Sequence, residues 1–118
     1  MYIATFQVTS DHELALLRID LSEDAMLAIY QLQDSTGTCH EWSVSMASDE
    51  TSKTYRERAA YALVAYLFDC QSNGWNGDIK LVQSGIGIPD AYWDLVREKF
   101  IGTMAFARVH RQEGEHLQ

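Results

Sequence analysis

Residues 48–70 read SDETSKTYRERAAYALVAYLFDC, and this stretch decides the predicted fold. Its first third is polar and charged, whereas the remainder is apolar on almost every side of a helix. A helix that is apolar all round has to be covered on every side by other parts of the chain. The sequence therefore predicts a central helix over about residues 48–72, with the remaining elements packed around it. Leu63 and Phe68 are predicted to lie in the core, where replacing either by alanine costs about 2–5 kcal/mol.

Both ends of the predicted helix carry capping signals. Ser48 and Asp49 offer side-chain oxygens for an N-cap, and Glu50 adds negative charge at the positive end of the helix dipole. The polar residues that follow them are alternative caps. At the other end, the pair Asn73-Gly74 favours the left-handed conformation that terminates helices.

The length and composition indicate one globular domain. The chain has 118 residues, 47% of them hydrophobic, which is enough for a core without cross-links. We expect the domain to cover residues 1–111 and a loose tail to cover residues 112–118. No signal peptide and no membrane-spanning run is recognisable, so the sequence predicts a cytoplasmic protein. Cys39 and Cys70 are expected to be free, buried thiols, with a disulfide between them as the alternative in an oxidising compartment.

The acidic residues are concentrated in the first part of the chain. The formal net charge is −8; residues 1–50 contain nine acids and one base, whereas residues 51–118 contain eight of each. Such a field repels nucleic acid phosphates and anionic membranes, and it attracts a basic protein. The sequence therefore predicts a basic protein partner, no direct contact with nucleic acid and no membrane association, and it leaves a homodimer open.

Period-two alternation of apolar residues predicts several strands, the first two forming a hairpin. The predicted strands cover residues 2–8, 14–21, 39–46 and 79–83. A short helix capped by Ser10 is the alternative for the second of them. Residues 22–34 favour a helix, because a cap and two acids precede good helix formers, but apolar residues at alternate positions leave a strand open.

A second helix is expected to begin at Pro89, to bury Tyr92, Leu95, Val96 and Phe100, and to end near residue 102. Residues 103–110 are predicted to form a closing strand, with a continued helix as the alternative. Strands and helices mixed in this way predict an α+β domain, in which a small antiparallel sheet packs on the central helix with one or two further helices.

The sequence contains no strong catalytic, metal-binding or nucleotide-binding motif. Gly85 and Gly87 precede a helix, but the loop lacks the third glycine and any basic residue of a phosphate loop, and its isoleucines are expected to plug the core. Cys39, His40 and Glu41 are adjacent on a strand, so His40 points away from its neighbours and the three cannot share a metal. We therefore expect no catalytic residue, no metal and no cofactor.

Two tryptophans are candidate anchors for a partner. Trp93 has charged neighbours on its predicted helix face and is expected near the polar side, and Trp75 lies in a polar Asn-Gly frame. The predicted partner-binding residues are these two tryptophans and the acids of the first 50 residues that lie near predicted turns and helix starts. They are Asp11, Glu13, Glu23, Asp24, Asp34, Asp49, Glu50, Trp75 and Trp93.

Two functional hypotheses follow from these patterns. In the first, the protein is a non-catalytic acidic binding protein that docks on a basic partner; small acidic domains of this kind include inhibitors, immunity proteins and nucleic-acid mimics that block host defence. In the second, it is a small-molecule-binding protein or enzyme with an aromatic-lined pocket between helix and sheet. The candidate lining residues for that pocket are Trp42, Tyr55, Tyr61, Tyr66 and Trp93.

Overall fold

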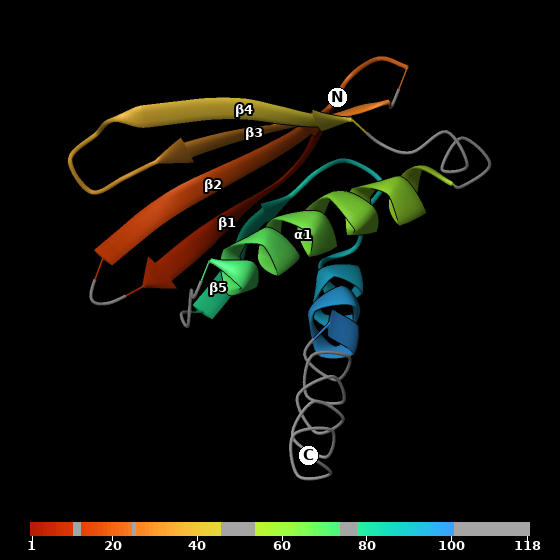
Figure 1. The fold of residues 1–118 in the computed structure, drawn as a ribbon. Helices are drawn as coiled ribbons and strands as arrows, with labels where there is room; N and C mark the ends of the chain where they lie inside the picture. Colours follow the sequence, from red (N-terminus) through yellow and green to blue (C-terminus); the bar gives the residue numbers. More distant parts are fainter. Residues whose placement is uncertain (11–12, 25, 46–53, 74–77, 101–118) are drawn as a thin grey trace, which may run out of the picture.

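The structure of the chain is a computed structural model. It describes residues 1–10, 13–24, 26–45, 54–73 and 78–100 (Figure 1). Asp11, Asp49, Glu50 and Trp75 lie outside the described residues, as do the predicted closing strand over residues 103–110 and the predicted tail.

Five strands form one antiparallel sheet in the order β4-β3-β2-β1-β5 (Figure 1). The strands are β1 (Tyr2–Ser10), β2 (Glu13–Leu21), β3 (Leu27–Gln33), β4 (Cys39–Ser45) and β5 (Asp78–Ser84). The first four follow one another as a meander, and β5 pairs with β1 after the chain has passed through helix α1 (Tyr55–Ser72). The predicted N-terminal hairpin is confirmed, since β1 and β2 pair over most of their length.

Helix α1 lies across one face of the sheet, and a second helix over residues 90–100 packs on the same side (Figure 1). The predicted α+β architecture is therefore confirmed. None of the helices in the described ranges has the length and hydrophobicity needed to span a bilayer.

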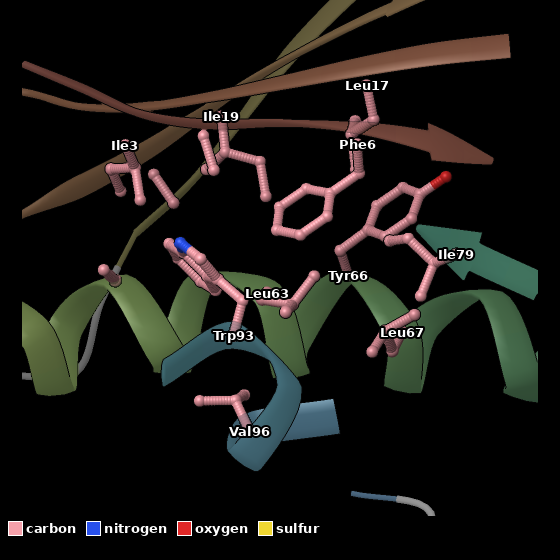
Figure 2. Packing of buried hydrophobic residues seen from close by; sticks show 14 of the residues in the cluster. Ile3, Phe6, Leu17, Ile19, Leu63, Tyr66, Leu67, Ile79, Trp93 and Val96 are labelled. Carbon is pink, nitrogen blue, oxygen red and sulfur yellow. The ribbon is translucent and has the colours of Figure 1, made fainter. Parts of the chain in front are cut away.

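The core lies between the sheet and the two helices, and Figure 2 shows its side chains from close by. Alternate residues of each central strand point toward the helices, as the period of a strand requires. The second helix contributes Trp93, whose ring meets the Phe6 ring edge-on with 5.3 Å between centroids. The central core residues include Ile3, Phe6, Leu17, Ile19, Leu63, Tyr66, Leu67, Ile79, Trp93 and Val96.

The start of α1 differs from the prediction. The helix begins at Tyr55, not near Ser48, and Thr54 is its N-cap residue. The Glu57 backbone N–H donates to the Thr54 hydroxyl oxygen at 3.3 Å, and the Thr54 hydroxyl donates to the Glu57 carboxylate at 3.0 Å.

The prediction that α1 is covered on every side is wrong. Ala59, Leu63 and Tyr66 form part of a buried stripe at helical spacing, whereas Tyr61 and Phe68 lie on the opposite side. Phe68 is 59% exposed, so it is not the core residue that the sequence predicted. The small sheet and one further helix cover only part of the circumference of α1.

The helix that we favoured over residues 22–34 is also absent, since Leu27–Gln33 forms strand β3. Ser22 and Asp24, which resemble a helix start, build the turn before this strand instead. The Ser22 hydroxyl donates to the Asp24 carboxylate at 2.7 Å, and the Met26 backbone N–H donates to the same oxygen at 3.1 Å. Side chains of this kind compete with helix formation by holding the backbone in a turn.

The predicted buried face of the second helix is confirmed for Val96 and Phe100 but not for Leu95. Trp93 is only 2% exposed, and Val96 and Phe100 are buried beside it, whereas Leu95 is exposed. The expectation that Trp93 lies near the polar side is therefore wrong. Of the two loop isoleucines, Ile88 is buried as predicted but Ile86 is not.

Candidate functional site

The acidic residues of the first part of the chain lie on one side of the folded molecule, because the strands that carry them are neighbours in the sheet. Among the described residues, strands β2 to β4 and their turns carry six acids and one base, a net charge of −5. The described parts of β1, β5 and the helices carry six acids and five bases. The acidic part of the molecule is therefore the side of the sheet that ends at β4. Its charged residues are Glu13, Asp20, Glu23, Asp24, Asp34, Glu41 and Arg18.

The predicted acids do not gather in a single cluster. Glu23 and Asp24 lie in the turn between β2 and β3, whereas Asp34 lies in the turn between β3 and β4, at the opposite end of the sheet. The seven residues of β3 separate these turns by roughly 20 Å. Glu13 begins β2 at the same end as Asp34. The structure thus places the acids around this half of the sheet, at both of its ends.

Two of these acids have local roles in their turns. The Asp34 carboxylate accepts hydrogen bonds from the Thr36 hydroxyl at 2.6 Å and from the backbone N–H groups of Thr36 and Thr38 at 3.0 Å. These bonds, that of the Thr36 hydroxyl first, hold the pKa of Asp34 below its usual range. Asp24 has a lowered pKa for the same kind of reason, its bond from Ser22 being the largest cause. Turn geometry alone therefore accounts for the choice of aspartate at both positions.

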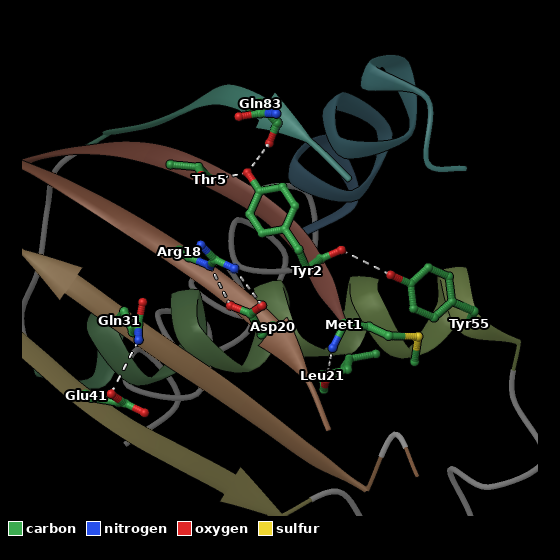
Figure 3. A network of polar contacts seen from close by, with 10 residues as sticks. All are labelled: Met1, Tyr2, Thr5, Arg18, Asp20, Leu21, Gln31, Glu41, Tyr55 and Gln83. Carbon is green, nitrogen blue, oxygen red and sulfur yellow. Dashed lines mark hydrogen bonds and ion pairs between the residues drawn. The ribbon is translucent and has the colours of Figure 1, made fainter. Parts of the chain in front are cut away.

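A polar network covers the sheet face opposite the helices, and Figure 3 shows it. The Arg18 guanidinium pairs with Asp20 at 2.9 Å and lies 4.8 Å from the centre of the Tyr2 ring. On the neighbouring strands, the Gln31 amide donates to Glu41 at 3.3 Å. Exposed leucines lie among these polar groups, and no described element covers this face. Asp20 and Glu41 were not among the predicted site residues.

An aromatic hollow of about 250 Å³ lies on the other face, between β3, β4 and α1. Tyr30 and Trp42 are paired across β3 and β4, and their rings stack with 5.3 Å between centroids and 17° between planes. The Tyr66 ring of α1 lies next to both. Its centroid is 6.0 Å from that of Tyr30 and 6.3 Å from that of Trp42. The lining residues are Tyr30, Trp42, Val44, Ala65, Tyr66 and Asp69.

The hydroxyls of the two tyrosines are held in the protonated form. Tyr30 donates its hydroxyl to the Ala62 carbonyl at 2.7 Å, and burial raises its pKa well above the usual value. Burial also raises the pKa of Tyr66, and a hydrogen bond with the Cys70 side chain raises it further. Burial raises the pKa of the Cys70 thiol as well. These groups therefore stay neutral at physiological pH, and Asp69 is the charged group in the lining.

Two of the five predicted lining residues lie at this hollow. They are Trp42 and Tyr66, and Tyr30, which was not among the predicted residues, lines the hollow with them. Tyr55 lies elsewhere, with its hydroxyl directed at the Tyr2 carbonyl. The alternation of residues 28, 30 and 32 was the signal that would have placed Tyr30 on the helix-facing side.

A larger apolar groove of about 430 Å³ lies between α1 and the second helix. It brings exposed side chains of both helices together, including Phe68 and Leu95, and its charged lining residue is Lys99. The complete described lining is Ala60, Val64, Phe68, Tyr92, Leu95, Val96, Lys99 and Phe100.

Trp93 has no surface with which to anchor a partner. Its indole N–H donates to the Ser84 hydroxyl at 2.8 Å, which satisfies the ring within the core. Cys39 is exposed and Cys70 is half-buried, and neither forms a disulfide. The expectation that both thiols are buried is therefore wrong for Cys39.

Comparison with known proteins adds no relative, because no family model, curated protein or solved structure matches this chain.

Proposed function

We propose that the protein is a non-catalytic binding protein whose acidic half, strands β2 to β4 with their turns, docks on a basic protein partner. The observation that supports this proposal is the net charge of −5 on this half of the sheet, against −1 for the other described elements. A one-sided field orients a diffusing partner before contact, whereas an evenly spread charge serves solubility alone.

The sheet face opposite the helices is the docking surface that we assign to this partner. It carries Glu41 and the Arg18–Asp20 pair, together with exposed Leu16. Apolar groups within a polar rim are the composition of protein interfaces. A partner with a surface built to hold phosphates matches this charge, so inhibition of a nucleic-acid-binding protein is the role that we propose.

A matched pair of charge-reversal variants tests the proposal. The first changes Glu13, Glu23 and Glu41 to Lys, because these side chains are exposed and, unlike those of Asp24 and Asp34, have no described hydrogen bond within a turn. Asp24 and Asp34 are left in place, since their replacement would disturb the turns themselves.

The control changes Asp90, Asp94 and Glu98 on the second helix to Lys, which alters the net charge equally. Affinity capture from an extract of the native cell, at low and high salt, is the measurement. We expect a basic protein to be captured by the wild type and the control at low salt, and to be lost in the first variant. Equal capture by the two variants would contradict the proposal.

A second candidate function is the binding of a small molecule in the aromatic hollow. The observation that favours it is that three stacked aromatic rings, from two strands and one helix, line an open volume of about 250 Å³. Changes in the Trp42 indole resonance on addition of a ligand would test it directly, with the buried Trp93 indole as an internal reference.

A further inference from the structure

We propose that the aromatic hollow binds an alkylammonium group, such as a quaternary ammonium or the methylated head of a lysine side chain. This inference rests on the second candidate function, because it names the chemical class of the ligand for that hollow. Three features of the hollow carry it: aromatic walls, a carboxylate in the lining and a small volume.

The aromatic walls are held in place before any ligand arrives. Tyr30 is fixed by its hydrogen bond to the Ala62 carbonyl and by burial. Trp42 stacks on Tyr30, and Tyr66 packs against both from α1. Because Tyr30 and Tyr66 are buried, Trp42 is the ring of the three that a ligand would contact most. Aromatic rings attract cations through the negative charge of their faces. Because these side chains are already ordered, binding a ligand costs less conformational entropy.

The charge in the lining selects for a cation. Asp69 is exposed at the hollow, and no ion pair with its carboxylate is formed by the described side chains. The tyrosine hydroxyls stay protonated because burial raises the pKa of both. The strands that form one wall belong to the half of the sheet with a net charge of −5. An anionic ligand would meet repulsion from all of these charges.

The volume limits the size of the bound group. Pockets for drug-sized ligands have volumes of about 300–1,000 Å³, and this hollow, at about 250 Å³, is smaller. It therefore fits one ammonium head with its methyl groups rather than a nucleotide or a large cofactor. Such a head comes from a free organic cation or from the side chain of a protein, and the chemistry that recognises it is the same.

Titration with choline and with its neutral isostere 3,3-dimethyl-1-butanol separates a cation site from an apolar one. The Trp42 indole N–H signal is followed by NMR, and the Trp93 signal, whose indole is buried and bonded to Ser84, is the reference. We expect choline to shift the Trp42 signal and not the Trp93 signal. The isostere is expected to bind several-fold more weakly, since it lacks the charge.

Two variants and one control test the named groups. Trp42→Leu is expected to weaken choline binding roughly two- to thirty-fold, as the loss of one cation–π contact does. Asp69→Asn is expected to weaken it about two- to five-fold and to leave the isostere unchanged. Asp94→Asn removes an exposed acid from the second helix and is expected to change neither ligand.

The outcomes distinguish the inference from the function on which it rests. If the isostere binds as tightly as choline, the inference is overturned while a small-molecule site survives. If no ligand shifts the Trp42 signal, both fail. A tripeptide with a central trimethyllysine tests whether the ammonium belongs to a protein side chain. If it binds more tightly than choline, the natural ligand is a protein; if it binds more weakly, the natural ligand is a free organic cation.

Discussion

Leu63 and Phe68 are both large apolar residues of α1, yet they have opposite surroundings. Leu63 is buried between the sheet and the second helix, whereas most of the Phe68 side chain is in solvent. We therefore expect Leu63→Ala to lower the free energy of unfolding by about 2–5 kcal/mol. Phe68→Ala is expected to cost less than about 1 kcal/mol, because an exposed side chain leaves no cavity. Urea unfolding measures both, and equal losses would contradict this packing.

The buried tyrosines of the hollow make stability depend on alkaline pH. The pKa values of Tyr30 and Tyr66 are raised above the usual 10.0, chiefly by burial. Above that pH, the unfolded chain loses protons that the folded chain retains. These two groups therefore contribute fully to stability below pH 10, and their contribution falls as the pH rises further.

We expect the free energy of unfolding of the wild type, measured with urea, to fall as the pH rises past about 10, relative to its value at pH 8. A double variant, Tyr30→Phe with Tyr66→Phe, lacks both hydroxyls and is expected to lose less over the same interval. The double variant also loses the hydrogen bond from Tyr30 to the Ala62 carbonyl, which costs about 1 kcal/mol at any pH. Each protein is therefore compared with its own free energy of unfolding at pH 8. An equal loss with pH in both proteins would show that these hydroxyls are not the cause.

The junction of β1 and β5 depends on Gly85, which directly follows β5. A Cβ atom at Gly85 would lie 2.6 Å from the Tyr2 carbonyl oxygen and 2.7 Å from that of Ile3. The Gly85 backbone N–H also donates to the Ile3 carbonyl at 2.6 Å, so the two segments cannot simply move apart. Gly85→Ala is therefore expected to lower the free energy of unfolding by about 1–3 kcal/mol, as overpacking does.

Gly37→Ala is the matched control, because a Cβ atom there meets nothing within 4 Å and the strain comes from φ of 88° alone. We expect that variant to lose about 1 kcal/mol or slightly more and to keep its sheet intact. Urea unfolding and the amide chemical shifts of β1 are the measurements. Unperturbed β1 shifts in Gly85→Ala would contradict the close approach.

At the level of elements, the strands with clean alternation were predictable and the mixed segments were not. Residues 17–21 and 39–46 alternate without interruption, and the strands that contain them have bounds close to the predicted ones. Residues 22–34 have good helix formers, but the pairing of β3 with β2 and β4 on both sides decides their structure. Trp93 was expected near the polar side because of its charged neighbours, yet one of them, Arg97, lies beside it and donates to the Ile79 carbonyl of β5 at 2.7 Å.

At the scale of the whole molecule, the sequence located the charge but not its arrangement. The concentration of acids in the first 50 residues was evident, and the sheet order places those described on one half. Asp24 and Asp34 lie at opposite ends of β3, as they would at the two ends of the predicted helix, but an extended strand separates them further. The aromatic hollow was visible only in part, because Tyr30 and Trp42 meet through strand pairing.

The proposed steering by the acidic half predicts a kinetic signature. An electrostatic field acts on the encounter of two proteins, so it changes the association rate more than the dissociation rate. For the partner recovered by capture, we expect the variant with Lys at positions 13, 23 and 41 to associate more slowly than the wild type. Its association should also depend less on salt, while its dissociation rate changes little.

The variant with Lys at positions 90, 94 and 98 carries the same net charge, and it separates local steering from total charge. If the acidic half orients the partner, this control retains most of the association rate at low salt, because the changed acids lie on the second helix. If net charge alone governs the encounter, the two variants slow equally. Stopped-flow association across a salt series distinguishes these cases, and rates that are unchanged in both variants at every salt concentration would refute steering altogether.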